Sequence, residues 1–280
     1  MEFNKKLHKA VQSAESILCV GLDPNPARIP DSFKAHFDKP ETMVVEFCSQ
    51  IIDATSAYCC AFKPNLAFFE ALGARGLEAF QSVLNQIPDG KIVIADAKRG
   101  DIGSTAEFYK KAYFEQFDVD AITLNPLMGF DTLDPFLDRP DKAVYSLVLT
   151  SNPGSNDLLL RRFEGRLSLA EYIAGQLSRK SEKSAGHLGM VIGATHSDAL
   201  EQVLGSYPEA SLLIPGIGSQ GGSVSDLERS LAAHKGIPLV SSSRSILYAG
   251  EGGNKWKDDV AKAAKKTSKE LKSITKRFLE

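Results

Sequence analysis

Short apolar stretches alternate with longer amphipathic stretches along the whole chain. Eight of the short stretches are rich in β-branched and other apolar residues, which is the composition of buried strands. The stretches between them repeat apolar residues at helical spacing, as Val44, Phe47 and Ile51 do. The eight predicted strands cover residues 17–22, 58–63, 91–95, 121–124, 143–150, 189–192, 211–214 and 238–241.

Strands that alternate with helices indicate a parallel sheet, because parallel neighbours need crossover connections. The sheet is either open and doubly wound or closed into a barrel. Asp23-Pro24-Asn25-Pro26 follows the first strand, where a dinucleotide-binding sheet would carry Gly-x-Gly-x-x-Gly. The count of eight strands favours an α/β fold of the (β/α)8 TIM barrel type. No linker or low-complexity stretch divides the chain, so we expect residues 1–280 to be a single catalytic domain.

The composition is that of an ordinary globular protein, with 43% hydrophobic and 24% charged residues. A net charge of −2 gives no general attraction to nucleic acid or acidic membranes. The stretch 255–280 carries nine Lys or Arg against four Asp or Glu, and we interpret it as a final helix with a solvated basic face. Since the start of the chain lacks the apolar core of a signal peptide and no run of about 18 apolar residues occurs, we expect a cytoplasmic protein without membrane or nucleic-acid partners.

Four cysteines are present, and none of them is in a Cys-x-x-Cys motif. Three of the four, Cys19, Cys59 and Cys60, lie in apolar stretches where cysteine acts as a small buried hydrophobe. We therefore expect all four, including Cys48, to be reduced thiols.

Polar side chains follow every predicted strand at its carboxyl end, where α/β barrels place their chemistry. Any one of them could be incidental, but their common position predicts an active site at one end of the barrel. In chain order they are Asp23, Lys63, Asp96 with Lys98, Asn125, Ser151 with Asn152, Thr195 with His196, the segment from Pro215 to Gln220, and Ser243 with Arg244.

The most unusual polar group is the Asp-x-Lys-x-x-Asp cluster formed by Asp96, Lys98 and Asp101. Alternate residues of a strand share one face, so Asp96 and Lys98 are expected to point together into the barrel mouth. A purely structural ion pair is the alternative, but partly buried pairs contribute little stability. Two carboxylates keep the lysine protonated and oppose an anionic substrate group, at roughly 4 kcal/mol for a like-charge contact of about 4 Å. The cluster therefore predicts an acid catalyst.

The last two strand ends have the composition of a phosphate site. Gly216, Gly218 and Gly221 leave backbone amides accessible, and Gln220 and Arg244 add side-chain donors. Loops in this part of a TIM barrel commonly bind phosphate, and a glycine-rich loop is able to close over a ligand.

Together these motifs resemble the orotidine 5′-phosphate decarboxylase family, in its longer bacterial-type subgroup (type 2). The most specific element is the segment 96–103, Asp-Ala-Lys-Arg-Gly-Asp-Ile-Gly, which matches the family signature Asp-x-Lys-x-x-Asp-Ile. Segments 61–65 and 149–154 are similar to the longer subgroup in particular. The resemblance runs from residue 20 to residue 245, and Ser243 stands where the family more often has glycine.

The resemblance implies a carboxy-lyase that converts orotidine 5′-phosphate to UMP and CO2 in pyrimidine biosynthesis, with no cofactor and no metal. Lys98 would protonate C6 of the pyrimidine, and Asp96 would lie beside the departing carboxylate. The working unit would be a homodimer with a shared active site. Asp101, Ile102 and Thr105 would reach into the neighbouring subunit and complete a charge array with Lys63.

The same resemblance implies a set of substrate-binding residues. Asp23 and Lys63 would hold ribose hydroxyls, and Ser151 would contact the pyrimidine ring. Gln220 and Arg244 would bind the phosphate, and Pro215 and Ser243 would complete the substrate site.

Two other functions are weighed against this one. The first is a Mg2+-dependent lyase similar to 3-keto-gulonate-6-phosphate decarboxylase or hexulose-phosphate synthase. Those enzymes place a metal-binding Glu where this chain has Lys63, whose ammonium group repels a cation. The second is a phosphoribosyl-ligand binding protein without catalysis, against which the intact Lys98 argues. The roles of His196 and of Arg161-Arg162 stay open between structural or solvated side chains and ligand or lid contacts.

Overall fold

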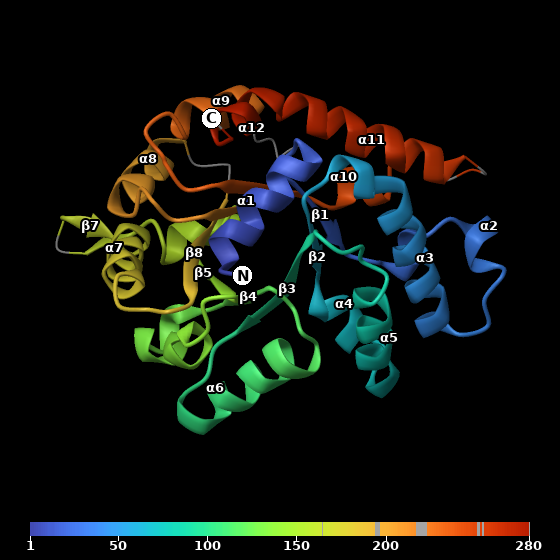
Figure 1. Cartoon of the computed structure of the whole chain (residues 1–280), viewed down its shortest axis with the longest axis horizontal. Helices are drawn as coiled ribbons and strands as arrows, with labels where there is room; N and C mark the ends of the chain where they lie inside the picture. The colour runs from blue at the N-terminus through green and yellow to red at the C-terminus, as the bar shows by residue number, and fades with distance from the viewer. Residues whose placement is uncertain (164, 194–196, 217–222, 251–252, 254, 280) are drawn as a thin grey trace.

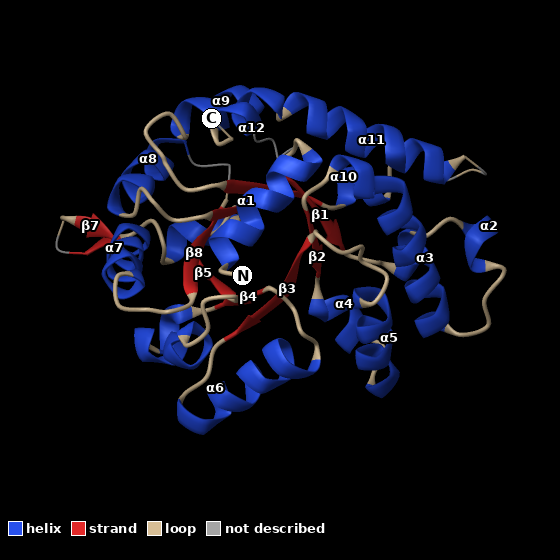
Figure 2. Cartoon of the chain, viewed as in Figure 1, coloured by secondary structure: helices blue, strands red, loops and turns tan. Residues whose placement is uncertain are grey.

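The computed structural model describes the chain except for residues 164, 194–196, 217–222, 251–252, 254 and 280. Eight parallel strands close into a barrel in the order β1-β10-β9-β8-β5-β4-β3-β2, and helices surround it (Figures 1 and 2). This architecture confirms the predicted (β/α)8 TIM barrel. The barrel strands are β1 (Leu18–Leu22), β2 (Ala61–Pro64), β3 (Ile92–Arg99), β4 (Ala121–Leu124), β5 (Ala143–Leu149), β8 (His187–Ile192), β9 (Leu212–Pro215) and β10 (Pro238–Ser242).

The strands form where the apolar runs predicted them, because strands that are buried on both faces read as nearly continuous hydrophobic sequence. Every residue of β1, β2 and β4 is buried. Most predicted boundaries lie within two residues of those in the structure, and two differ by more. The segment Ser56–Tyr58 is a 3-10 helix (η2) that precedes β2, and β3 continues to Arg99, beyond the predicted end at residue 95.

Helices cover the outside of the barrel with their apolar faces inward. In α3 (Pro40–Thr55), the buried residues Val44, Phe47 and Ile51 have the spacing that predicted a helix. Phe47 stacks on Trp256 of α11 (Trp256–Glu270) at a ring distance of 5.3 Å. The helices are α1 (Phe3–Ala14), α2 (Asp31–Lys34), α3 (Pro40–Thr55), α4 (Leu66–Glu70), α5 (Ala74–Leu84), α6 (Gly103–Lys110), α7 (Leu169–Ser181), α8 (Ser197–Ser206), α9 (Val224–Ser230), α10 (Arg244–Leu247), α11 (Trp256–Glu270) and α12 (Lys272–Arg277). Shorter turns are the 3-10 helices η1 (Pro26–Arg28), η4 (Pro126–Met128), η5 (Phe130–Leu137) and η6 (Pro153–Asp157), and the π-helix η3 (Lys111–Gln116).

Helix α1 lies across the N-terminal end of the barrel (Figure 1). Phe3 is fully buried, with its ring stacked on His187 at 5.3 Å and edge-on to Tyr145 at 6.4 Å. Lys6 forms an ion pair with the buried carboxylate of Asp120, which also accepts the backbone N–H of Val93 at 2.8 Å. This end of the barrel is therefore covered by protein.

The C-terminal segment packs beside the same end of the barrel. The predicted final helix is two helices, α11 and α12, which meet at Leu271. Thr275 accepts a hydrogen bond from the backbone N–H of Ile17, just before β1, and Arg277 donates to the carbonyl of His234, just before β10. Both ends of the chain thus lie near the N-terminal ends of the strands.

A short antiparallel hairpin interrupts the connection between β5 and α7. Its strands are β6 (Arg162–Phe163) and β7 (Leu167–Ser168), and Gly165 has a positive φ of 70°. Ser168 then caps α7, because its hydroxyl accepts the N–H of Glu171 while the Glu171 carboxylate accepts the N–H of Ser168. The hairpin was not predicted.

The four cysteines are free and buried, as predicted. Burial raises the pKa of the Cys19 and Cys59 thiols to about 12, so both stay protonated and unreactive at neutral pH.

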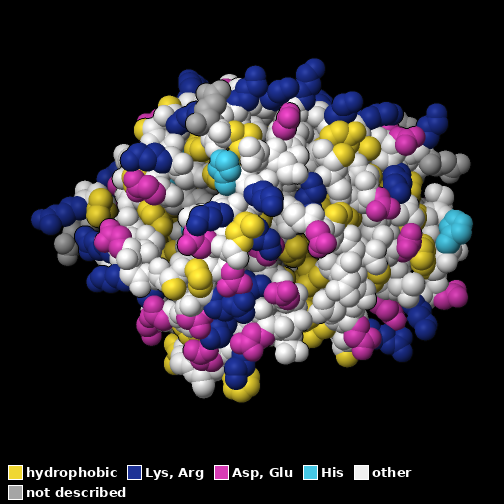
Figure 3. All heavy atoms as spheres, viewed as in Figure 1, with side chains coloured by type: hydrophobic (Ala, Val, Ile, Leu, Met, Phe, Trp, Pro, Cys, Tyr) yellow, Lys and Arg dark blue, Asp and Glu magenta, His cyan; other side chains and the backbone are white. Residues whose placement is uncertain are grey.

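In the part of the chain that the structure describes, no helix combines the length and the apolar character needed to cross a membrane. On the face seen in Figure 3, positive and negative side chains are interspersed.

Candidate active site

A cavity of about 240 Å3 opens at the C-terminal ends of the barrel strands. This is the end at which TIM barrels carry their chemistry. Three elements supply its charged residues and its rim: β2 with Lys63, the end of β3 with Asp96 and Lys98, and the end of β9 with Pro215. The remaining lining residues are Thr123, Leu147, Thr150, Ser151, Asn152, Val191 and Leu213.

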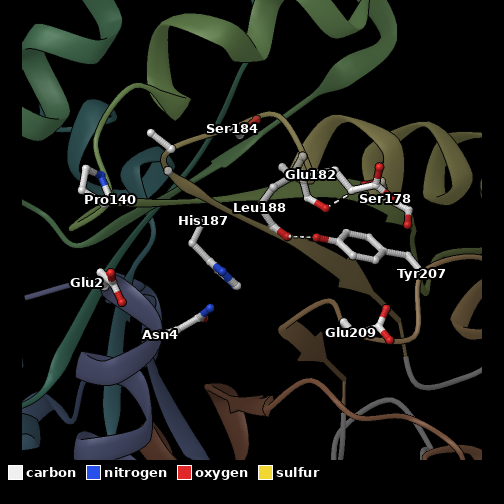
Figure 4. A pocket seen from close by; sticks show the side chains of 13 residues that line it. Glu2, Asn4, Pro140, Ser178, Glu182, Ser184, His187, Leu188, Tyr207 and Glu209 are labelled. Carbon is white, nitrogen blue, oxygen red and sulfur yellow. Dashed lines mark hydrogen bonds between the residues drawn. The ribbon is translucent and has the colours of Figure 1, made fainter.

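A larger cavity of about 460 Å3 lies at the opposite end of the barrel (Figure 4). It is lined by His187 at the start of β8, by Glu2 before α1 and by Tyr207, whose hydroxyl donates to the carbonyl of Leu188 at 2.9 Å. Because barrel chemistry is built on the loops at the other end, we assign the candidate active site to the smaller cavity.

The centre of the site is one carboxylate held between two ammonium groups. Lys63 donates to Oδ2 of Asp96, and Lys98 donates to Oδ1 of the same carboxylate at 2.5 Å. The side chains of Lys63 and Asp96 are 6% and 9% exposed, whereas that of Lys98 is 50% exposed. Lys98 is therefore the cation of this group that an incoming ligand meets.

The burial and the charges of this group fix its protonation. Burial by itself raises the pKa of Asp96, but the ammonium groups of Lys63 and Lys98 outweigh that effect and hold the pKa well below its usual range. Burial likewise lowers the pKa of Lys63, and the carboxylates of Asp96 and Asp23 outweigh it, so that the pKa lies above its ordinary value. At neutral pH Asp96 is an anion and Lys63 a cation.

Lys98 lies on a bulge at the end of β3. Four residue steps separate Ala95 from Arg99, whereas two steps separate their partners Ile122 and Leu124 on β4. The extra residues leave the regular ladder, and Lys98 has a φ of 48°, in the left-handed region that side chains rarely adopt. Bulges and positive φ values concentrate at functional sites, where they aim a side chain that a regular strand would point elsewhere.

Asp23 follows β1 and lies near the buried ammonium group of Lys63. Its Oδ1 is buried and has no hydrogen-bond partner among the residues that the structure describes. A buried carboxylate oxygen without a partner is costly, and a ligand hydroxyl would satisfy it. The hydroxyl of Tyr248 holds this loop, because it donates to the carbonyl of Asp23 at 2.7 Å and accepts the N–H of Asn25 at 2.6 Å.

Asp101, Ile102 and Thr105 are not among the residues that line the cavity. Asp101 is half-buried and its Oδ1 accepts the N–H of Ile102 at 2.8 Å, while Ile102 and Thr105 are exposed. Large apolar side chains near them are also exposed: Ile102 at 55%, Phe108 at 70%, Leu127 at 54% and Met128 at 56%. Ile102, α6 and η4 thus expose large apolar side chains.

The predicted phosphate site is described in part. Pro215 lines the cavity and Gly216 has a positive φ of 101°, whereas Gln220 lies outside the described residues. Ser243 is half-buried, and a Cβ on Gly21 would come within 1.9 Å of its Oγ, so residue 21 has to be glycine for Ser243 to sit there. Arg244 begins α10 with an exposed side chain.

The roles of His196 and of Arg161-Arg162 were left open by the sequence, and the structure describes only the two arginines. His196 lies outside the described residues, as does Thr195. Arg161 and Arg162 are exposed, and Arg162 donates to the side chain of Gln202 at 2.8 Å and to the carbonyl of Arg166 at 2.7 Å. Arg162 therefore joins the hairpin to α8.

Sequence reasoning missed Thr123 and Tyr248. Thr123 in the middle of a buried strand looks like an ordinary β-branched strand residue, and Tyr248 lies far along the chain from the loop that it holds. In the described part of the chain, no group of three or more His, Cys, Asp or Glu side chains is placed to hold a metal ion.

Comparison with known proteins assigns the family. Residues 16–258 match the model of the family described as "Orotidine 5'-phosphate decarboxylase / HUMPS family". The chain belongs to this family. The match covers the whole barrel and the cavity, and it confirms the family that the residues of 96–103 predicted.

Similar members of the orotidine 5′-phosphate decarboxylase family include curated bacterial proteins and solved structures. The orotidine 5′-phosphate decarboxylase of Herpetosiphon aurantiacus is 44% identical over 94% of this chain and 95% of its own length. That of Janthinobacterium sp. is 40% identical and covers 100% of both chains. The solved OMP decarboxylase of Leishmania donovani is 36% identical and superposes with a TM-score of 0.82, over 98% of this chain and 99% of that chain.

Proposed function

We propose that this chain decarboxylates orotidine 5′-phosphate to UMP and CO2, with Lys98 as the proton donor. The observation that carries the proposal is the half-exposed ammonium group of Lys98, held against the buried anion Asp96 in a cavity at the barrel mouth. Loss of CO2 from C6 leaves its electron pair on a ring carbon, with no adjacent carbonyl to delocalise it. A cation fixed beside that carbon stabilises the developing charge before it forms.

The reaction then needs only groups of this site. The bond from C6 to the carboxylate breaks, CO2 departs, and a proton moves from Lys98 to C6 to form the C–H bond of UMP. Asp96 is ionised and lies where it would repel the substrate carboxylate, which would raise the energy of the bound substrate. Binding of the phosphate far from C6 would supply the energy that holds the ring in this position.

The other predicted residues are proposed to bind the nucleotide. Asp23 and Lys63 would hold the ribose hydroxyls, which the unpartnered Oδ1 of Asp23 supports. Ser151 would contact the pyrimidine. Pro215, Gln220, Ser243 and Arg244 would surround the phosphate. Residues 1–280 would act as one catalytic domain, in the cytoplasm.

We also propose that the active unit is a homodimer with shared sites. Asp101, Ile102 and Thr105 do not line the cavity of their own chain, and large apolar side chains are exposed at Ile102, in α6 and in η4. A second copy that covers this surface would place Asp101 beside the partner's Lys63 and Lys98.

To test the reaction, the purified protein is incubated with orotidine 5′-phosphate and excess chelator. Turnover is measured as the loss of the substrate's ultraviolet absorbance. We expect turnover that chelator leaves unchanged. Turnover that appears only with added Mg2+ would favour a metal-dependent sugar-phosphate lyase. The ammonium group of Lys63 argues against that function, because it repels a metal cation. Binding of the nucleotide without turnover would reduce the protein to a ligand-binding one.

A further inference from the structure

The bulge that presents Lys98 is held by one hydroxyl group on the neighbouring strand. Thr123 lies in β4 between Ile122 and Leu124, directly opposite the extra residues of β3. Its Oγ1 accepts the backbone N–H of Ala97 at 3.1 Å and that of Lys98 at 3.0 Å. These are amides of the segment that has left the regular ladder, so the hydroxyl replaces part of the missing strand pairing.

The same hydroxyl also reaches the carboxylate of the site. Thr123 Oγ1 donates its proton to Oδ1 of Asp96 at 3.1 Å, the oxygen that also accepts the ammonium group of Lys98. A hydroxyl has one donor and two acceptor sites, and here all three are used. Thr123 is 1% exposed, so water does not compete for these bonds.

We propose that Thr123 is a positioning residue, whose hydroxyl fixes the backbone turn at Lys98 and the rotation of the Asp96 carboxylate together. A φ of 48° is unfavourable for lysine and persists only when its surroundings determine it. Without the hydroxyl, the N–H groups of Ala97 and Lys98 lose their acceptor, and the segment is free to relax toward an ordinary strand conformation. The ammonium group would then move relative to the reacting carbon.

This inference rests on the proposed function, because it assigns Thr123 to the placement of the proton donor. A displacement of about 1 Å in a reacting group costs on the order of 10²-fold in rate. The loss is expected in kcat, since the contacts that bind the ribose and phosphate come from other residues.

Two pairs of variants isolate the hydroxyl. The wild-type and Thr123→Val differ by the hydroxyl at nearly constant volume, and Thr123→Ser and Thr123→Ala differ by the hydroxyl with the methyl absent from both. We expect Thr123→Val and Thr123→Ala to lower kcat by about 10²-fold, and Thr123→Ser to stay within about fivefold of the wild-type. The affinity for UMP, measured by calorimetry, should stay within about threefold in all of them. If Thr123→Val does not fold, the Ser and Ala pair still gives the comparison.

The matched control is Thr55→Val. Thr55 is also a fully buried threonine, and its hydroxyl donates to the carbonyl of Ile51 within α3, away from the cavity. We expect this variant to be less stable with kcat unchanged, which separates a loss of stability from a loss of positioning.

A measurement without substrate keeps this inference apart from the proposed reaction. Hydrogen–deuterium exchange of a peptide that covers residues 92–99 should be faster by about tenfold in Thr123→Val, and close to the wild-type in Thr123→Ser. A wild-type protein that does not decarboxylate the substrate overturns the proposed function, while the exchange still tests the hydroxyl. Unchanged exchange, a kcat for Thr123→Val within threefold of the wild-type, or equal losses in the Ser and Ala variants would each overturn the role of Thr123.

Discussion

Lys63 of β2 and Asp96 of β3 form an ion pair inside the mouth of the barrel, with both side chains less than a tenth exposed. The pair keeps the carboxylate of Asp96 negatively charged, and Lys98 binds to this carboxylate. A buried carboxylate with one permanent cationic partner stays ionised, and it accepts a second ammonium group on its other oxygen. The more exposed lysine is thus held by a fixed anion at the lining of the cavity.

Removal of the proposed proton donor tests the centre of the mechanism. We expect Lys98→Ala to lower kcat by at least about 10³-fold, because both the stabilising cation and the proton are lost. UMP binding, measured by calorimetry, should remain detectable. Lys5→Ala, an exposed lysine at the other end of the barrel, is the control and should leave kcat unchanged. A Lys98→Ala enzyme with a near-normal rate would falsify the assigned donor.

Mixing of two inactive variants tests the shared site. Asp101→Ala and Lys98→Ala should each be inactive alone, because each homodimer lacks one component in both sites. After subunit exchange at equal concentrations, half of the dimers are hybrids with one complete site, so about a quarter of the wild-type activity should return. Exchange is checked with two subunits of different tag mass. Proven exchange without recovered activity rules out sharing.

The loop that carries Asp23 should depend on the hydroxyl of Tyr248. Tyr248→Phe leaves the carbonyl of Asp23 and the N–H of Asn25 without their partner, which costs about 1–3 kcal/mol of stability. We expect KM for orotidine 5′-phosphate to rise by about tenfold with kcat within about threefold, because Asp23 is proposed to bind ribose and not to react. Tyr58→Phe, in η2 at the far end of the barrel, is the control. A loss confined to kcat would contradict this assignment.

His187 should make the fold sensitive to mild acid. Burial lowers its pKa to about 4, below the ordinary value of 6.5, so the unfolded chain binds a proton that the folded chain excludes. The stabilisation by the neutral ring is complete above pH 6.5 and is lost as the pH falls toward 4. Unfolding by urea at several pH values measures this slope.

The slope should be smaller in His187→Gln, whereas His36→Gln, at an exposed position, should behave like the wild-type. Equal slopes in the wild-type and in His187→Gln would mean that other groups cause the acid sensitivity.

The barrel and the position of its site were predictable from the sequence because both depend on local composition. Buried parallel strands are apolar throughout, so the exceptions, such as Lys63 and Asp96, mark the strand ends that carry chemistry. Asp96 and Lys98 were expected to face the same way by strand alternation, and they do meet. Strand alternation alone does not place Lys98 there, however, because β3 bulges between Ala95 and Arg99 and Lys98 has a positive φ.

Other features depend on contacts between distant segments, which one sequence does not reveal. The role of Thr123 arises from the register of β3 on β4, and that of Tyr248 from the closure of the barrel, which brings residue 248 to residue 23. The hairpin between β5 and α7 was missed for a different reason. Its strands are two residues each, too short for an alternating pattern.

Both chain ends pack at the N-terminal end of the barrel. Phe3 contacts Tyr145 of β5 and His187 of β8, and Arg277 contacts His234, which precedes β10. The nucleotide would enter by the opposite opening. An affinity tag, a surface tether or a second enzyme fused to either end would therefore lie at the N-terminal end of the barrel and leave the active-site opening unobstructed.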